Sequence, residues 1–531
     1  MRLLVFHGYL LHGTGSNVYN ARLAAALAGQ GHTVELLSQE LRPEELGFVD
    51  AVGTWEHGRP EVRVLREPVR VTAWRPPIGD LLPVYVADRY EGITARPFLE
   101  CSDAEIERYV EANVAAVRDV AARTRPDAAL ANHLVMGPLI LARALGGAVP
   151  YAVKVHGSAL EYVVKRDPER FGPAAREGLA GARTVLCGSR HTAESLWAAM
   201  GDDQLPARTR LGPPGVDVHE FRPRDRAEAA AGVRALAARL EAAPAPSGVQ
   251  QSAFSRDEPA VGRALAGLDL DHGRHVAYVG KLIVSKGVDL LAAAWPLVLG
   301  EVPDARLVVV GFGAFREGLE RLLGALAAGD LGAARAIALA GREAEGGPRA
   351  PLRLLLAFLD RLEEDAGAAD AYRAAAAGLP ERVVLTGRLD HDELAPLLAA
   401  CEAQVVPSTF PEAFGMVAAE AAACGTLPLS AAHSGLAEVT AILAAAVPAE
   451  ARGWLSFDVS DRAVEAIAER LVAWLRAGPG LRDRTRAALE EVARERFSWE
   501  GVADGVVAAA EGRLGDLPRV PSTGHAIDAS G

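Results

Sequence analysis

A repeated order of short apolar runs, loops and helical patterns constrains this chain more than any other feature. Its first instance has an apolar run over 2–6, the loop HGYLLHGTGSN, a helical pattern over 18–28 and a second apolar run over 33–37. Short apolar runs are typical of the buried strands of a parallel sheet. A strand, a helix and a second strand make the basic unit of a doubly wound sheet.

The same order recurs in two series along the chain. The first series continues with strands predicted over 128–130, 151–155 and 184–187 and a helix over 190–200. The second series has strands predicted over 276–279, 306–310, 382–385, 403–406 and 427–429. The segment LGPPGVD between them is rich in proline and glycine, as hinges are. We therefore predict an α/β fold in which two Rossmann-like domains face each other across a cleft, with ligands bound at loops that follow strands.

Charge and composition exclude several classes of function. Lys and Arg number 56 against 69 Asp and Glu, and the net charge of −13 disfavours a general nucleic-acid-binding protein. The four cysteines are scattered without a CxxC pair, which favours a reducing compartment over a disulfide framework or a structural zinc site. The sequence has no signal-peptide pattern and no uninterrupted run of 18 apolar residues. We expect a cytoplasmic protein without an integral membrane segment and without a nucleic-acid partner.

The strongest local signal is the segment STFPEAFGMVAAEAAACG, which follows a predicted strand. Its pattern predicts a helix that begins near Gly415, with Glu412 in the loop before it and Glu420 inside it. The first amides of this helix, those of Gly415, Met416 and Val417, lack helical partners and favour an anion. Carboxylates accept hydrogen bonds from sugar hydroxyls, so we assign Glu412 to a donor sugar and Glu420 to ribose. The alternative is that both are ordinary surface glutamates and that one of them caps the helix.

A second signal is the segment YVGKLIVSKGVDLL, which begins in the strand predicted over 276–279. Lys281 lies in the following loop and Lys286 at the start of the next helix. The helix dipole disfavours a cation at this end, so we infer that the two lysines hold a diphosphate. Two solvated lysines are the alternative. Weaker signals are the loop Gly13-Thr14-Gly15-Ser16, which is not a complete GxGxxG fingerprint, and His156, which follows a strand.

Together these segments resemble the family 4 glycosyltransferases, which have the GT-B fold. The motifs that carry the resemblance cover most of residues 1–497 apart from the insertions, and they are GTGSNVYNARLAAALAGQGHTVELL, HGSALEY, PPGVDVHEFRP, GKLIVSKGVDLL, VVVGFG, PEAFGMVAAEAAACG and HSGLAE. The ending FSWEGVADGVV resembles the last helix of the family, which crosses back to the first domain.

The resemblance, together with the Pro/Gly-rich hinge and the polar composition of the tail, predicts five segments. They are an N-terminal Rossmann-like acceptor domain over 1–212, a hinge and insertion over 213–274, a C-terminal Rossmann-like nucleotide-sugar-binding domain over 275–496, a crossover helix over 497–515 and a disordered tail over 516–531. Apolar periodicity predicts a second insertion, made of helices, over about 315–379. We expect both insertions to be peripheral because they add no strand–loop motif.

The resemblance also implies a retaining transfer of a sugar from a nucleotide-diphosphate sugar donor to an acceptor. The residues carried over by position are, for catalysis, His156, Lys281, Lys286 and Glu412, and, for donor binding, Gly15, Phe414, Gly415, Met416, Val417 and Glu420. The chain departs from the family at Lys281, where arginine is usual, and at Thr14-Gly15, where Gly-Gly is usual. Lysine binds a phosphate as a point charge and not as a planar fork.

The resemblance implies a mechanism that uses the nucleotide-diphosphate sugar as donor substrate and needs neither a cofactor nor a metal. Family members are thought to react on one face of the sugar while the leaving phosphate helps to deprotonate the acceptor. The DxD matches Asp269-Leu270-Asp271 and Asp390-His391-Asp392 are weak, and Asp390 is better interpreted as a helix cap. A nucleotide-sugar epimerase, a phosphorylase and a non-catalytic nucleotide-sugar binder are the alternatives.

We expect a small-molecule or glycan acceptor that is soluble. The helical pattern around 104–123 carries Glu105, Glu107 and Glu111 and lacks the basic face that docks on anionic lipid. Contacts with the acceptor are expected from the first domain, at Asp88-Arg89-Tyr90-Glu91. A weak homodimer is compatible with these features.

Overall fold

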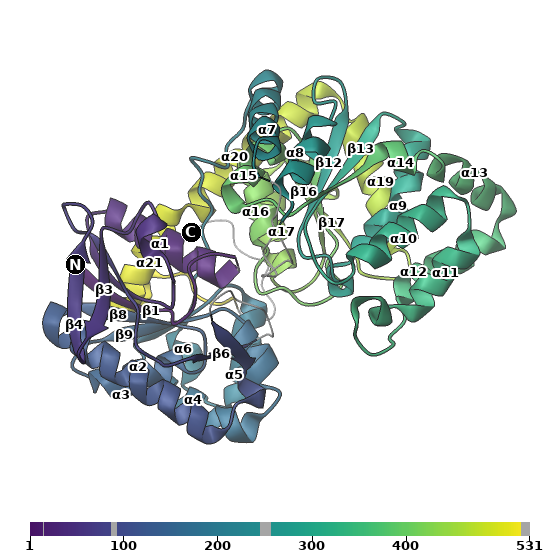
Figure 1. The fold of residues 1–531 in the computed structure, drawn as a ribbon. Coiled ribbons are helices and arrows are strands. Elements are labelled where there is room, and N and C mark those ends of the chain that lie inside the picture. The colour runs from purple at the N-terminus through teal and green to yellow at the C-terminus, as the bar shows by residue number, and fades with distance from the viewer. Residues whose placement is uncertain (14, 86–92, 245–255, 522–531) are drawn as a thin grey trace. The chain divides into compact units, whose positions relative to one another are not determined.

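The computed structural model describes residues 1–13, 15–85, 93–244 and 256–521, and it divides the chain into two units (Figure 1). The first unit comprises residues 1–215 together with 497–521, and the second comprises residues 216–244 together with 256–496. The chain therefore returns to the first unit after it has completed the second.

The first unit is built on a nine-stranded sheet within the described residues. Neighbouring strands are parallel, apart from the last pair, which is an antiparallel hairpin at the edge. The order across the sheet is β11 (Thr209–Leu211), β10 (Thr184–Cys187), β9 (Tyr151–Val155), β8 (Ala128–Asn132), β1 (Arg2–Phe6), β2 (Thr33–Leu37), β5 (Val71–Trp74), β3 (Ala51–Glu56) and β4 (Arg59–Val64). The sheet is thus doubly wound, and the connections change direction between β1 and β8.

Alternate strand residues form two cores on opposite faces of this sheet. Leu4 and Phe6 pack with residues of α2 (Asp103–Thr124), α3 (Gly137–Leu145) and α4 (Pro168–Ala180). Leu3 and Val5 pack on the other face, which α1 (Gly15–Gly29) and α21 (Trp499–Glu511) cover (Figure 1). The predicted C-terminal helix thus belongs to the first unit. Smaller elements complete this unit: β6 (Leu81–Val84), β7 (Thr94–Pro97), α5 (Arg190–Met200) and α6 (Leu205–Arg208).

The second unit is built on a six-stranded parallel sheet within the described residues. Its order is β14 (Val383–Gly387), β13 (Ala305–Val310), β12 (Arg274–Val279), β15 (Ala403–Val406), β16 (Leu427–Ala431) and β17 (Ser456–Phe457). β12 and β15 are neighbours although they are far apart in the sequence, with Tyr278 opposite Val405. The direction of winding changes between them, and loops that leave their carboxyl ends meet at one place.

Helices cover this second sheet and carry the inserted segments. The helices that follow the strands are α9 (Val288–Glu301), α15 (His391–Ala399), α16 (Met416–Ala423), α17 (Ser434–Ala446), α18 (Ala449–Arg452), α19 (Ala463–Arg476) and α20 (Pro479–Phe497). The first insertion forms α7 (Arg226–Glu241) and α8 (Glu258–Ala266), which pack on each other and on α15 and β14. The second forms α10 (Arg316–Ala327), α11 (Leu331–Ala340), α12 (Arg353–Glu364), α13 (Ala366–Ala376) and α14 (Leu379–Arg382).

The sequence-based expectation of a disordered tail over 516–531 is wrong for residues 516–521. Leu517 is buried in the first unit, and the carbonyl of Pro518 accepts a hydrogen bond from the amide of Leu211. Arg519 pairs with Arg210 in a β-bridge. The apolar Leu517 side chain and these backbone hydrogen bonds explain the order of this segment. The rest of the predicted tail, residues 245–255 of the predicted hinge and insertion, and the acceptor residues Asp88-Arg89-Tyr90-Glu91 lie outside the described residues.

Two further observations concern composition. In the part of the chain that the structure describes, none of the helices is long and apolar enough to cross a bilayer. The four cysteines, Cys101, Cys187, Cys401 and Cys424, are buried and form no disulfide.

Candidate functional site

An ion pair between Lys286 and Glu412 lies at the winding switch of the second unit. Lys286 ends a short 3₁₀ turn after β12, and Glu412 stands in the loop after β15, 126 residues later in the sequence. The lysine Nζ donates to Glu412 Oε1, and the two side chains are 33% and 23% exposed. Ser408 Oγ donates to the same carboxylate oxygen at 2.7 Å. The charges of the two side chains thus balance each other, and two hydrogen bonds fix the position of the carboxylate.

The helix predicted near Gly415 begins there. Gly415 is the N-cap of α16 with φ 127°, and a Cβ at this position would lie 2.6 Å from the Leu436 side chain, so only glycine fits. Phe414 is buried, whereas Met416 and Val417 are half-buried at the first turn. The first amides of α16 are therefore oriented for an anion, at the same end of the sheet as Lys286.

Glu420 lies inside α16, as predicted, and it is nearly fully buried, so it is not a surface glutamate. One of its carboxylate oxygens lies 3.6 Å from Nε2 of His391, and the ring of His391 packs on Phe221 at 5.0 Å between centroids. Asp390, which precedes this histidine, caps α15 in a capping box with Glu393, so its interpretation as a helix cap is confirmed.

The loop between Lys281 and Lys286 is held in place from two sides. Lys281 is exposed, and its carbonyl accepts a hydrogen bond from the Tyr278 hydroxyl at 2.9 Å. The carbonyl of Ser285 accepts hydrogen bonds from the amide of Thr409 at 2.9 Å and from its side chain at 3.3 Å. These bonds tie the loop after β12 to the loop after β15.

The second side of this loop is held by the inserted segment, which differs from the expectation that both insertions are peripheral. Glu345 Oε2 accepts a hydrogen bond from the Val284 amide at 2.9 Å, and its side chain is 9% exposed. Arg342 pairs with the other carboxylate oxygen at 3.0 Å. A backbone bridge between Gly341 and Ala350 closes the segment that carries Glu345. The insertion therefore contacts the loop between the two candidate phosphate-binding lysines.

In the first unit, Gly15 and His156 follow β1 and β9. Gly15 is the first residue of α1, and a Cβ there would meet no atom within 4 Å. The Nε2 of His156 lies 2.8 Å from Oδ1 of Asn132, at the end of β8. An amide oxygen only accepts, so this nitrogen carries the proton and Nδ1 of the neutral ring is the acceptor.

Burial lowers the pKa values of three histidines in the first unit, His7, His133 and His156. Burial holds the pKa of His156 well below its ordinary value, and the nearby positive charges of His133, Lys154 and His7 would lower it further. Burial lowers the pKa of His7 to about 4, although its Nε2 donates to Asn17 Oδ1 and to the Leu10 carbonyl, and burial holds the pKa of His133 well below 6.5. Both ring nitrogens of His133 lack a hydrogen-bond partner. Burial also lowers the pKa of Lys154 to about 8.

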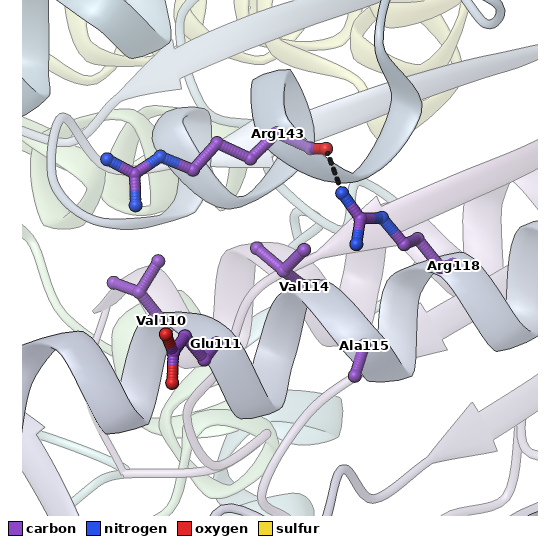
Figure 2. A pocket seen from close by; sticks show the side chains of 6 residues that line it. All are labelled: Val110, Glu111, Val114, Ala115, Arg118 and Arg143. Atoms are coloured by element: carbon purple, nitrogen blue, oxygen red, sulfur yellow. Dashed lines mark hydrogen bonds between the residues drawn. The ribbon is translucent and has the colours of Figure 1, made fainter.

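A surface groove lies elsewhere in the first unit, between α2 and α3 (Figure 2). Its lining residues are Val110, Glu111, Val114, Ala115, Arg118 and Arg143. Arg118 donates to the backbone carbonyl of Arg143 at 2.9 Å, and the Arg143 guanidinium is paired with Glu107 and Glu177. None of the predicted site residues lines this groove. Among the described residues, no three His, Cys, Asp or Glu side chains gather as a metal site would require.

Several residues of the site were not predicted from the sequence. Ser408, His433 and Ser434 contact Glu412 or its loop, Glu345 contacts the lysine loop, and Asn132 contacts His156. One signal was present: the segment HSGLAE follows β16 as PEAFG follows β15, and loops after parallel strands are where ligands bind. No local pattern marks Glu345.

Two family models match the chain. The glycosyl transferase 4-like domain matches residues 14–215, and the model of glycosyl transferases group 1 matches residues 370–496. The first match lies in the first unit and the second match in the second unit.

Curated relatives include D-inositol 3-phosphate glycosyltransferases. The protein from Segniliparus rotundus is 30% identical over 264 residues, which is 50% of this chain and 45% of that protein. The protein from Mycobacterium bovis is 28% identical over 314 residues, which is 59% of this chain and 45% of that protein. The aligned part thus spans a little under half the length of these relatives.

Solved structures resemble the whole chain in fold. Sucrose-phosphate synthase from Thermosynechococcus elongatus has a TM-score of 0.54 at 20% identity, covering 97% of this chain and 99% of its own. Anabaena HepE in complex with UDP and glucose has a TM-score of 0.53 at 14% identity, covering 96% of this chain and 99% of its own. At these identities the likeness concerns the fold alone.

Proposed function

Since the chain belongs to the group 1, 4-like glycosyltransferases with the GT-B fold, we propose that it is a retaining glycosyltransferase. Its donor is a nucleotide-diphosphate sugar, and its acceptor is a small molecule or glycan. The observation that carries the proposal is the Lys286–Glu412 ion pair beside the first turn of α16. A sugar diphosphate fits this arrangement. Its phosphates can bind the lysine and the helix N-terminus, and its sugar hydroxyls can donate to the carboxylate at the same end of the sheet.

Donor binding in this proposal exchanges the partner of Lys286. The diphosphate takes the ammonium group from Glu412 and also accepts hydrogen bonds from the first amides of α16, with Lys281 adding a second positive charge. Glu412 then accepts hydrogen bonds from hydroxyls of the donor sugar. Glu420, which is buried and next to His391, accepts hydrogen bonds from the ribose.

The transfer breaks the bond between the anomeric carbon and the diphosphate oxygen and forms a bond from that carbon to the acceptor oxygen on the same face. The proton of the acceptor hydroxyl goes to the departing diphosphate. The protein contributes by positioning the donor and by stabilising the charge that develops on the leaving group. His156 helps to position the donor: its ring is neutral, and its Nδ1 accepts a hydrogen bond from a hydroxyl of the donor sugar.

The test is a panel of UDP-, ADP- and GDP-sugars, assayed for release of the nucleoside diphosphate with and without candidate acceptors. UDP-glucose is the first choice because Anabaena HepE, which shares the fold, has been solved with it. The proposal expects release of a nucleoside diphosphate and a sugar product. An epimerase would return an altered nucleotide sugar, a phosphorylase would require inorganic phosphate, and a non-catalytic binder would leave every donor intact.

A further inference from the structure

The segment His433-Ser434-Gly435 follows β16 and begins α17, next to the loop that carries Glu412. This segment belongs neither to the Lys286–Glu412 ion pair nor to the first turn of α16. The amide of Gly435 donates to the Glu412 carbonyl at 3.0 Å. A Cβ on Gly435 would lie 2.6 Å from the Phe414 amide nitrogen, so the close approach of the two loops requires glycine.

The hydrogen bonds of His433 and Ser434 have defined directions. His433 Nε2 lies 2.7 Å from the carbonyl oxygen of Ser408, which only accepts, so Nε2 carries the proton. In the neutral ring Nδ1 is then an acceptor, and the Ser434 hydroxyl donates to it at 3.0 Å. The Ser434 oxygen in turn accepts a hydrogen bond from the Glu412 amide at 2.8 Å.

These bonds close a ring around Glu412. Ser408, whose carbonyl anchors His433, donates its own hydroxyl to the Glu412 carboxylate at 2.7 Å. Glu412 is therefore held at its amide by Ser434, at its carbonyl by Gly435 and at its carboxylate by Ser408. His433 thus hydrogen-bonds both Ser408 and Ser434, the residues that hold the carboxylate and the amide of Glu412.

Ser434 makes its contact in a backbone conformation that serine rarely adopts. Its φ is +51°, in the left-handed region that disfavours residues with a Cβ. Strained residues persist where the surrounding structure requires them, and they cluster at functional sites. Glycine would relieve the strain but would remove the oxygen that binds the Glu412 amide.

We infer that His433 and Ser434 are positioning residues that set the Glu412 carboxylate for the transfer step. This inference rests on the proposed function, because it assumes that Glu412 contacts the donor sugar. It extends the site to the loop after a third strand, β16. It also separates stability from activity: the Ser434 conformation costs stability and is retained for the position of Glu412.

The test uses the 531-residue chain and four variants, with the donor of highest wild-type turnover and with UDP as the binding probe. Ser434→Gly should keep or raise Tm, leave the Kd for UDP within about twofold of wild type and lower kcat about tenfold. His433→Phe, which keeps a ring without hydrogen bonds, should lower kcat similarly. His433→Gln should recover most of it, because its amide both donates and accepts.

The matched control is His57→Gly in the first unit, where the backbone has nearly the same φ of +50° outside the site. It should keep or raise Tm without a change in kcat. Wild-type kcat in both Ser434→Gly and His433→Phe would overturn the inference, as would parallel losses of Tm and UDP affinity. Absence of wild-type turnover with every nucleotide sugar would refute the proposed function, which is a different outcome.

Discussion

Replacing Glu412 by glutamine should have opposite effects on binding and on turnover. Glu412 forms an ion pair with Lys286, so a diphosphate that binds this lysine must displace the carboxylate. A partly exposed ion pair of this kind contributes about 1 kcal/mol, and Glu412→Gln removes this competition together with the repulsion between carboxylate and diphosphate. The Kd for UDP should therefore fall about three- to tenfold, which corresponds to roughly 0.7–1.4 kcal/mol.

The same substitution should slow sugar transfer by about tenfold or more, since each 1.36 kcal/mol of lost transition-state stabilisation is tenfold in rate. Unfolding free energy should change by less than about 1 kcal/mol, because glutamine still accepts the Ser408 hydroxyl and the lost pair is partly solvated. Calorimetry with UDP, initial rates with the donor and thermal unfolding measure the three quantities.

The exposed Glu450→Gln, which changes the net charge equally, is the control and should leave all three quantities unchanged. Weaker UDP binding by Glu412→Gln, or turnover at the wild-type rate, would refute the assignment of Glu412 to the donor sugar. A large loss of stability would instead mark this residue as a structural cap.

Three further predictions concern other parts of the site. Lys286→Met should weaken UDP binding by about 1.5–3 kcal/mol in calorimetry. Lys165, an exposed lysine of the first unit, gives the control Lys165→Met, which should keep the wild-type affinity. Equal affinity in both variants would contradict the diphosphate role. Glu345→Ala should raise KM for the donor several-fold with little change in kcat, whereas the exposed neighbour variant Glu343→Ala should not; equal kinetics would show that the insertion does not affect the donor loop. His133→Phe should reduce the loss of Tm between pH 7 and pH 5. The pKa of the buried His133 is lowered, so below pH 6.5 the unfolded chain gains a proton that the folded chain does not, and this favours unfolding by up to about 1.4 kcal/mol per pH unit. An unchanged pH dependence of Tm would contradict this.

Much of the fold follows from local sequence patterns. The strands at the centre of both sheets are short apolar runs bounded by glycine or polar loops, and β1, β9 and β15 have the predicted bounds. The hairpin of β3 and β4 was not predicted, because β4 is largely exposed and β3 is buried only over its first three residues. The ordered tail was missed for a related reason: the single apolar residue Leu517 is too weak a signal among polar neighbours.

The candidate site could be predicted only where its residues lie in motifs. Lys286 and Glu412 each follow a strand with a recognisable loop, although their pairing joins positions 126 residues apart. Glu345 reaches the Val284 amide from an insertion, and His433 acts through Ser434; both contacts depend on tertiary packing that no local spacing encodes. The loops themselves were predictable, but the hydrogen bonds that hold Glu412 in place were not.

The most direct test of the account is proton NMR of the anomeric region during turnover of the best nucleotide sugar without acceptor. If water replaces the acceptor, a retaining enzyme releases equal amounts of nucleoside diphosphate and free sugar, the first-formed anomer of the sugar has the configuration of the donor, and Glu412→Gln lowers the rate. A first-formed anomer of the opposite configuration would contradict the account.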